Sequence, residues 1–552
     1  PDLFRVPGLC SERQHRHWRS TRSVVATGRV VAGQQRVFDR RYWREQVVSA
    51  WNPRRSARCE AISVTVSRKS RAQSEQRHRG FSSCRCCRSC IGFSDVERRA
   101  HWVSEPQRRC SRRRLRRFHV ALPHTAESGA SMKATVLSSG GKYKLGAFVV
   151  LLASLLWLRQ PPVGSVDPDA ERNVTEIITD KGYLVQEYEV TTRDGYVLRL
   201  QRIPYGRHVP ESSPSASRGL RTQGAPPVVV MHALLFSSAV WVVNGPDQGL
   251  PYVLADAGFD VWLANMRGNT QSRHLHYTRD QKEFWDFSFD DISKYDVPDT
   301  IDFVLNHTGH NKTLYVGHSL GAATLFGLLS ERPEYNDKIL LFSAFAPAVH
   351  FNNMKSPIGP VLPRFRELAA VAALFGRYDF LRRGWAIETF VATICRYPAT
   401  KAFCHGFITF VSGQQTRPIN ATRLPVFLSD VPSGTSFKNM IHIGQVYKNG
   451  RFAKFDYGEQ RNVDIYGQAT PPEYDLRRVS APVALFWTEG DALVPAEDMP
   501  LLRDKLPNLV LDFRVADDRF SHQEFAMGVT AREAVYDGLV DTMQRFSRQD
   551  VL

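Results

Sequence analysis

The stretch TLYVGHSLGAATLFGLLS, residues 313–330, decides the fold of this chain. It reads as an apolar strand, a Gly-x-Ser-x-Gly turn and an apolar helix, which is the setting of a nucleophile elbow. In such an elbow Gly317 and Gly321 let strand and helix approach closely, while His318 and Ser319 form the tight turn. Ser319 then projects its hydroxyl group from a strained backbone. The competing interpretation is an ordinary strand-to-helix turn in which Ser319 has no chemical role.

Apolar strand-like segments alternate with helix-like segments on both sides of this turn. Near-continuous apolar strands that alternate with helices are typical of a mostly parallel sheet with helices on both faces. An antiparallel hairpin is expected at the sheet edge over 187–205, where the pattern alternates around Asp194 and Gly195. The predicted sheet strands lie at 226–235, 259–268, 313–319, 338–347, 481–491 and 508–517. The sequence therefore predicts an α/β fold.

The alternation of strands and helices stops between residues 348 and 478. This stretch is rich in Phe, Tyr, Pro and Arg and is followed by two further predicted strands. We interpret it as a cap and lid inserted over the carboxyl edge of the sheet, where α/β enzymes bind their ligands. The sheet core is accordingly expected in two parts, residues 166–347 and 479–552.

Candidate partners for Ser319 follow it in the chain. A serine nucleophile needs a base, and the base needs an acid that fixes its tautomer. In elbow enzymes of this kind the order is Ser, then Asp or Glu, then His. Asp491 closes one predicted strand and His522 follows the next, so both are expected at the sheet edge that carries Ser319. Asp517 and Asp518 are second-choice acids because they lie on the later strand. Taken singly, Asp491 also fits a turn former and His522 a solvated loop residue.

The positive charge of the chain is concentrated before Met132, the first methionine. The 552 residues carry a net charge of +18, but residues 1–131 alone hold 28 Arg, one Lys and 10 acidic residues, which leaves −1 for the remainder. We expect residues 1–131 to be an Arg-rich segment that is disordered or is upstream sequence translated in frame. The rival is a nucleic-acid-binding arm, but arginine without lysine or interleaved aromatic residues disfavours it. CRCCRSC, residues 84–90, lacks a second cluster with zinc-site spacing, so no metal is expected.

Residues 132–165 have the layout of a secretory signal peptide. Basic residues precede an apolar run at 145–158, and small residues follow at 163–165. Fourteen apolar residues are fewer than the roughly 20 that a membrane span needs, so no permanent span is expected. Four glycosylation sequons fit export, although each also fits an unmodified chance match. They begin at Asn173, Asn306, Asn311 and Asn420.

From about residue 167 to the end the chain resembles the acid lipase family, the group of gastric and lysosomal acid lipases. The resemblance covers essentially all of the chain after the signal peptide. The matching blocks are GYLVQEYEVTTRDGYVLRLQRIPYG (182–206), NMRGNTQSRHLHY (265–277), EFWDFSFDDISKYDVPDTIDFVL (283–305), YVGHSLG (315–321), GDALVPAEDMPLL (490–502) and SHQEFAMG (521–528).

This resemblance implies an α/β hydrolase that cleaves ester bonds of triacylglycerols or cholesteryl esters at a lipid–water interface, without metal or cofactor. Matched motif to motif, Ser319 corresponds to the nucleophile, Asp491 to the acid and His522 to the base. The backbone N–H groups of Leu234 and Leu320 correspond to the oxyanion hole. The implied location is extracellular, with the lysosome lumen as the alternative.

Cys395 and Cys404 are the cysteines after the signal peptide. Export through an oxidising compartment favours a disulfide between them, with two buried free thiols as the alternative. The resemblance places this pair in the family's lid region, here about residues 383–412. Nothing in the sequence predicts an oligomeric state.

Two residues depart from the family pattern. Ala233 stands in HALL where a glycine is usual, and Leu320 replaces a glutamine. Ala233 would misdirect the Leu234 N–H if the backbone needed a glycine-only conformation there. Loss of one oxyanion donor costs about 10²- to 10³-fold in rate. Two rival functions therefore stay open, namely a carboxylesterase or lysophospholipase acting on smaller esters and a catalytically impaired lipid-binding homologue.

Overall fold

A computed structural model describes residues 167–207, 226–391 and 422–549, together with Cys395, Cys404, Gly406, Ile408, Thr409, Val411, Ser412 and Asn420. The predicted Arg-rich segment, 1–131, and the predicted signal peptide, 132–165, lie outside the described residues.

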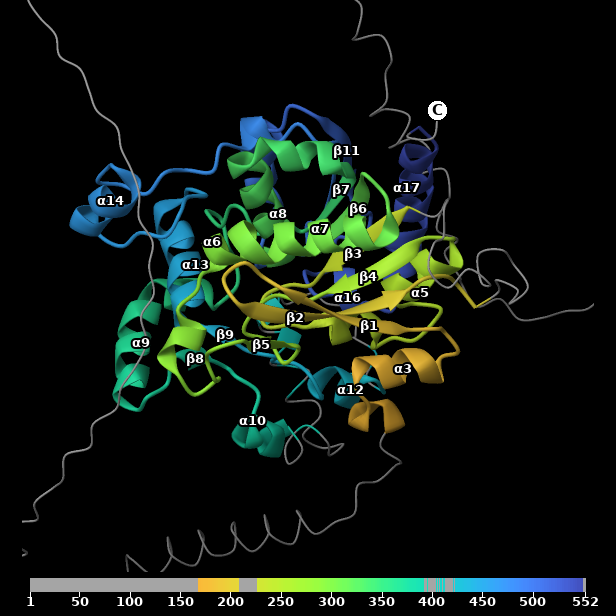
Figure 1. Cartoon of the computed structure of the whole chain (residues 1–552), viewed down its shortest axis with the longest axis horizontal. Coiled ribbons are helices and arrows are strands. Elements are labelled where there is room, and N and C mark those ends of the chain that lie inside the picture. Colours follow the sequence, from red (N-terminus) through yellow and green to blue (C-terminus); the bar gives the residue numbers. More distant parts are fainter. Residues whose placement is uncertain are drawn as a thin grey trace, which may run out of the picture. The chain divides into compact units, whose positions relative to one another are not determined.

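The described residues contain a nine-stranded sheet whose main path runs in the order β1-β2-β4-β3-β6-β7-β10-β11 (Figure 1). The run from β4 to β11 is parallel, while β1 and β5 pair antiparallel with β2, and β2 with β4. The strands are β1 (Gln186–Thr191), β2 (Tyr196–Ile203), β3 (Pro227–Met231), β4 (Asp260–Ala264), β5 (Ser272–His274), β6 (Thr313–His318), β7 (Ile339–Phe345), β10 (Val483–Trp487) and β11 (Leu509–Arg514). The predicted hairpin and parallel sheet are thus confirmed.

Both faces of the sheet are buried, which explains the near-continuous apolar strands. In β3, Val228 and Val230 belong to one apolar cluster, whereas Val229 and Met231 belong to another. Successive strand residues point to opposite faces, so the two clusters lie on opposite sides of the sheet. The first includes residues of α5 (Leu250–Asp256), α16 (Glu524–Met527) and α17 (Asp537–Gln549), and the second includes residues of α7 (Val297–Thr308) and α8 (Leu320–Glu331).

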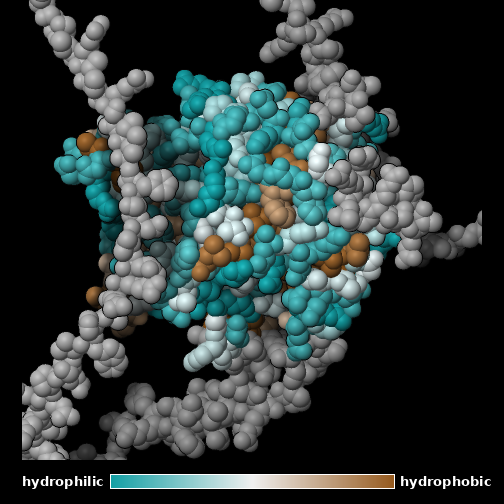
Figure 2. Space-filling view, viewed as in Figure 1, coloured by the Kyte–Doolittle hydropathy of each residue, from teal (hydrophilic) through white to brown (hydrophobic). Residues whose placement is uncertain are grey.

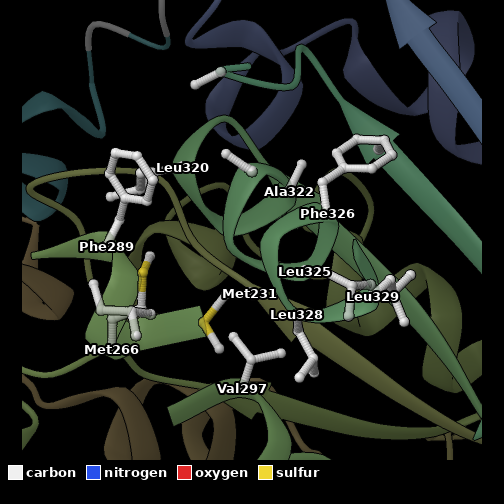
Figure 3. Close-up of a cluster of buried hydrophobic side chains, with 14 of the residues drawn as sticks. Met231, Met266, Phe289, Val297, Leu320, Ala322, Leu325, Phe326, Leu328 and Leu329 are labelled. Atoms are coloured by element: carbon white, nitrogen blue, oxygen red, sulfur yellow. The ribbon is translucent and has the colours of Figure 1, made fainter. Parts of the chain in front are cut away.

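Helix α8 is apolar on nearly every side because it is enclosed by the fold. All its residues from Leu320 to Ser330 are buried. Figure 3 shows Leu325 and Leu328 of this helix among Met231 and Val297, which come from β3 and α7. The helix that follows Ser319 is therefore anchored on the sheet and on its neighbouring helix.

The segment between β7 and β10 adds elements outside the main sheet. They are α9 (Phe365–Leu374), β8 (Asp379–Phe380), α10 (Trp385–Phe390), α12 (Leu424–Leu428), β9 (Thr435–Ser436), α13 (Phe437–Asn449) and α14 (Glu459–Tyr466). Strands β8 and β9 form a separate two-stranded sheet. We keep the name cap for residues 348–478; the boundaries of the two core parts and the cap stay predictions.

The cap is fastened to the loops that follow β3 and β4. Asp430 accepts hydrogen bonds from the hydroxyl groups of Ser237 and Thr270. The Ser433 N–H donates to the Leu235 carbonyl at 2.8 Å. These contacts join the cap to the carboxyl edge of the sheet.

Candidate active site

Ser319 lies at the junction of β6 and α8 with φ 56° and ψ −115°. A positive φ is strained for a residue with a side chain. The surroundings hold this conformation, since the Ser319 N–H donates to the Phe345 carbonyl at 2.9 Å and the Ala348 N–H donates to the Ser319 carbonyl at 3.2 Å. The strained turn expected of an elbow is therefore present at Ser319.

The two glycines of the motif are sterically required. A Cβ on Gly317 would lie 2.7 Å from the Ala322 backbone, inside α8. A Cβ on Gly321 would lie 2.5 Å from the His232 carbonyl oxygen and 2.8 Å from that of Met231. Only glycine allows β6, α8 and the end of β3 to approach this closely.

His522 and Asp491 form a buried hydrogen-bonded pair. The distance from His522 Nδ1 to Asp491 Oδ2 is 2.7 Å, and both side chains are almost fully shielded from solvent. Asp491 Oδ1 accepts the N–H groups of Leu493 and Val494, each at 2.8 Å. With Nδ1 donating to the carboxylate, Nε2 of His522 is left as the ring nitrogen that can accept a proton.

His318 connects the elbow to the loop that carries His522. Its Nε2 lies 3.0 Å from the His522 carbonyl oxygen, and the two ring centroids are 4.8 Å apart. Burial holds the pKa of His318 well below its ordinary value, and the nearby His522 ring adds to this lowering. His318 is therefore neutral and donates from Nε2 to the carbonyl, which brings the Ser319 turn and His522 together.

The two second-choice acids lie in other contacts. Asp517 accepts from the Arg519 N–H at 3.1 Å, and Asp518 pairs with Arg514. Strand β10 ends at Trp487, so Asp491 lies in the loop after the strand and not at its last position. The geometry thus favours Asp491 as the partner of His522.

Of the predicted oxyanion residues, one lies in the elbow and the other lies in the loop after the neighbouring strand β3. Leu320 is the first residue of α8, and Leu234 follows β3, whose Met231 pairs with Gly317 of β6. In the described part of the chain, four non-glycine residues have a positive φ, namely Leu235, Ser319, Ala346 and Leu381. Ala233 is not one of them. The backbone at Ala233 therefore does not need the glycine that the family usually has there.

The residue before Ala233 lies beside the elbow and was not among the predicted site residues. His232 is buried, and its Nδ1 lies 2.8 Å from the Ala233 carbonyl oxygen. Its Nε2 accepts from the Met266 N–H and from Asn269 Nδ2, each at 3.1 Å. The only sequence signal was its place in HALL, because the two groups that contact its Nε2 lie more than 30 positions away.

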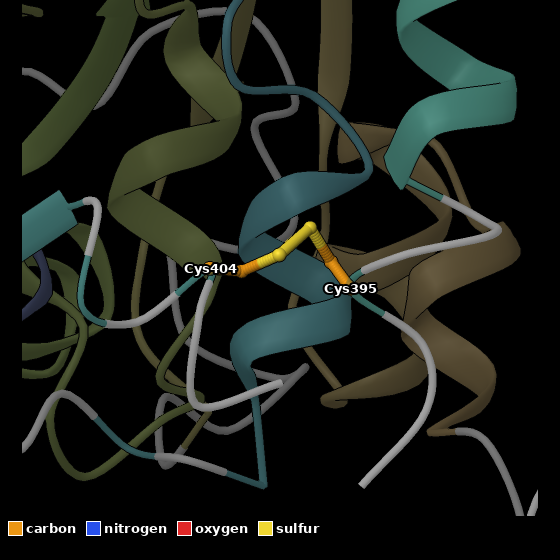
Figure 4. Close-up of a disulfide and its surroundings, with 2 residues drawn as sticks. All are labelled: Cys395 and Cys404. Atoms are coloured by element: carbon orange, nitrogen blue, oxygen red, sulfur yellow. A yellow bond between two sulfur atoms is a disulfide. The ribbon is translucent and has the colours of Figure 1, made fainter. Parts of the chain in front are cut away.

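Cys395 and Cys404 form a disulfide, as predicted, with their Cα atoms 5.6 Å apart (Figure 4). Three of the four sequon asparagines, Asn173, Asn306 and Asn311, are exposed. The asparagine of the fourth sequon is half-buried and accepts hydrogen bonds from Thr422. Glycosylation stays a prediction.

A solvent-open pocket lies where the predicted lid region, residues 383–412, begins. The pocket has a volume of about 510 Å³ and is lined mainly by residues at the end of α9, in β8 and at the start of α10, including Arg377, Phe380 and Trp385. Within the described residues, no helix has the length and apolar character needed to cross a membrane.

Comparison with known proteins agrees with this fold. Residues 174–245 match a family model described as a partial alpha/beta-hydrolase lipase region, and residues 226–375 match the alpha/beta hydrolase fold. The chain is 36% identical over 386 residues to lipase member K of Homo sapiens, across 69% of this chain and 93% of that protein.

Two further relatives cover a similar share. The chain is 37% identical over 376 residues to gastric triacylglycerol lipase of Homo sapiens, across 68% of this chain and 91% of that protein. It is 35% identical over 385 residues to a putative lysosomal acid lipase/cholesteryl ester hydrolase of Crotalus adamanteus, across 69% of this chain and 92% of that protein. The chain therefore belongs to the acid lipase family of α/β hydrolases, with the fold that its sequence predicts.

Proposed function

We propose that this protein is a serine lipase that hydrolyses the carboxylic ester bonds of neutral lipids, triacylglycerols or cholesteryl esters. The observation that carries the proposal is the buried His522–Asp491 pair, joined through His318 to a serine with a strained backbone. The names of the relatives, a gastric triacylglycerol lipase and a putative lysosomal acid lipase/cholesteryl ester hydrolase, support the substrate class.

In the first half of the reaction Ser319 Oγ attacks the ester carbonyl carbon while His522 Nε2 takes the hydroxyl proton. The carbonyl oxygen becomes an oxyanion, which the N–H groups of Leu234 and Leu320 stabilise. The C–O bond to the alcohol then breaks, and His522 gives its proton to the leaving oxygen. Asp491 stabilises the imidazolium throughout.

In the second half a water molecule attacks the acyl-serine ester. His522 takes a proton from this water, a second tetrahedral oxyanion forms, and its collapse releases the fatty acid. The proton returns from His522 to Ser319 Oγ. All proton transfers are carried by one imidazole, so the proposal includes no metal and no organic cofactor.

We further propose that the protein acts after export, in the extracellular space or alternatively in the lysosome lumen. The signal-like segment at 132–165, the four sequons and the disulfide support this route. Its substrate partner is then an emulsified or micellar lipid surface.

The test is hydrolysis of an emulsified long-chain triacylglycerol by the chain and by Ser319→Ala, with a short water-soluble ester measured in parallel. Loss of the nucleophile should lower kcat by about 10⁴- to 10⁶-fold. Ser330→Ala is the matched control, because this serine is buried in the same helix and its hydroxyl group donates to the Gly327 carbonyl. Equal activity of Ser319→Ala and the parent would overturn the proposal, and a preference for the soluble ester would support the esterase alternative.

A further inference from the structure

We propose that His232 is a positioning residue that fixes the Leu234 N–H as an oxyanion donor. This inference rests on the proposed function and adds a residue to its machinery. His232 acts through the peptide group that joins Ala233 and Leu234, and it does not touch the substrate.

The geometry of one peptide group carries the inference. The Ala233 carbonyl and the Leu234 N–H belong to the same planar trans unit, so they point in opposite directions. His232 Nδ1 lies 2.8 Å from the carbonyl oxygen, and the Phe236 N–H donates to the same oxygen at 3.2 Å. Holding this oxygen prevents rotation of the peptide plane, and therefore fixes the direction of the Leu234 N–H.

The tautomer of His232 is determined by its other contacts. Nε2 faces two donors, the Met266 N–H and Asn269 Nδ2, so Nε2 must accept and Nδ1 must carry the proton. The Asn269 amide cannot be reversed without loss, since its Oδ1 accepts the Gln271 N–H at 2.9 Å. Nδ1–H is thus the donor toward the Ala233 carbonyl.

His232 also remains neutral in acid. Burial lowers its pKa to about 4, so the imidazole stays uncharged and keeps this tautomer at pH 5 and above. Both acceptor and donor roles of the ring are therefore preserved in a mildly acidic compartment.

The peptide group that joins Ala233 and Leu234 lies beside the elbow, and its N–H is available to bind the oxyanion. The His232 carbonyl packs against Gly321 at the start of α8, since a Cβ on Gly321 would lie only 2.5 Å from the carbonyl oxygen. Among the hydrogen bonds between described residues, none has the Leu234 N–H as its donor. On the far side of the turn, the Leu235 carbonyl accepts from Ser433, so the turn is held at both ends.

Two substitutions of His232 distinguish a role in positioning the Leu234 N–H from a general contribution to folding. In His232→Asn the amide nitrogen takes the place of Nδ1, so the bond to the Ala233 carbonyl is kept while the acceptor for Met266 and Asn269 is lost. In His232→Gln the longer amide can still accept from Met266 and Asn269, but it no longer donates to the Ala233 carbonyl.

Steady-state kinetics on a soluble ester should distinguish the two variants. We expect kcat of His232→Gln to fall by about tenfold or more with KM little changed, because the oxyanion exists only in the transition state. His232→Asn should stay within about threefold of the parent. Equal losses in both variants, or a larger loss in His232→Asn, would overturn the inference.

A second measurement does not depend on the stability of the glutamine variant. Nitrogen-15 spectra of the imidazoles, with His232→Asn used for assignment, should show Nδ1 protonated and Nε2 unprotonated from pH 8 to 5. The opposite tautomer would overturn the inference. Ser319→Ala is measured alongside: hydrolysis that survives this change would overturn the proposed function, whereas a dead Ser319→Ala with a fully active His232→Gln would overturn only the role of His232.

Discussion

Ser319 stores strain in its backbone, and the cost is met by its neighbours. A non-glycine residue in such a conformation costs about 1–3 kcal/mol and persists where the surrounding structure over-determines it. Here the Ser319 carbonyl accepts the N–H groups of Ala322, Ala323 and Ala348, while its own N–H binds the Phe345 carbonyl. Hydrogen bonds to β7, to the residues after it and to α8 thus hold the strained backbone of Ser319. The position of its hydroxyl group therefore depends on how closely α8 approaches β3.

Gly321→Ala should therefore damage both stability and catalysis. The new Cβ would meet two backbone carbonyl oxygens, so β3 and α8 must separate, at a cost of about 1–3 kcal/mol. A displacement near 1 Å of the reacting groups can lower kcat by about 100-fold. Thermal unfolding and kcat on a soluble ester measure the two effects.

Gly384→Ala is the control for this substitution. Gly384 has φ 179°, and no atom lies within 4 Å of the position of its Cβ, so neither Tm nor kcat should change. Parental Tm and kcat in Gly321→Ala would show that the contact between β3 and α8 opens without cost.

At the scale of elements, a buried carboxylate joins the first helix of the described chain to the cap. Asp169 is fully buried and forms ion pairs with Arg172, with Lys181 at the end of α3 (Val174–Asp180) and with Arg423 before α12. Burial alone would raise the pKa of Asp169, but the hydrogen bonds from these three cations outweigh it and lower the pKa to about 2.

Asp169→Asn should lower the free energy of unfolding by about 2–4 kcal/mol at pH 7, since it removes the one buried carboxylate that three half-buried cations share. The folded pKa is lower than the ordinary value, so the unfolded state binds more protons as the pH falls from about 4 to 2. The parent loses the contribution of Asp169 in that window and the variant does not. Urea unfolding at pH 7, 4 and 3 should show that the difference in the free energy of unfolding between parent and variant becomes smaller as the pH falls.

Asp180→Asn is the matched comparison for this effect. Asp180 pairs with the same Arg172 and Lys181, but its side chain is 36% exposed, so we expect a much smaller loss than in Asp169→Asn. Equal losses in the two variants, or a loss in Asp169→Asn that is independent of pH, would contradict the role given to the buried carboxylate.

On the scale of the whole molecule, the cap exposes several large apolar side chains. Figure 2 shows one face of the described part as mainly hydrophilic with separate apolar patches. Helix α9, its end and the start of α10 expose Leu374, Phe375 and Trp385, each more than three-quarters accessible. Such side chains fit contact with a lipid surface, as proposed for this protein.

Replacing Leu374, Phe375 and Trp385 together by serine should weaken action at an interface without unfolding the protein. Each large apolar side chain contributes about 1.5–3 kcal/mol when fully buried, and these three are exposed in the protein alone. We expect hydrolysis of emulsified triacylglycerol to fall at least tenfold, while Tm and hydrolysis of a soluble ester stay unchanged.

The control changes two other exposed apolar residues, Val463 and Ile465 of α14, to serine. This variant should keep parental activity on both substrates. If it lost emulsion activity as strongly as the triple variant, apolar surface in general, and not the α9–α10 region, would be responsible.

The sequence allowed prediction of the features that short-range patterns encode. Glycine spacing around Ser319 and chain order predicted the elbow and the acid partner of His522, which the Asp491 contact matches. The extent of β10 was overestimated because an apolar run does not show where pairing with β7 stops. The contacts of His232 with Met266 and of Asp169 with Arg423 were not predicted, because these partners are distant in the chain and only the fold brings them together.

The parallel pairing of β7 with β10 across the cap also has a consequence for biosynthesis. Val483 of β10 pairs with Phe342, so one edge of β7 stays open until the ribosome has added the intervening residues. At about 5–20 residues per second this takes on the order of ten seconds. During that time the nascent chain carries Ser319 without Asp491 or His522, and with an unpaired strand edge. On the proposed function, the growing polypeptide therefore lacks the acid and the base while it is made, and the open edge of β7 can pair with other chains until translation has passed β10.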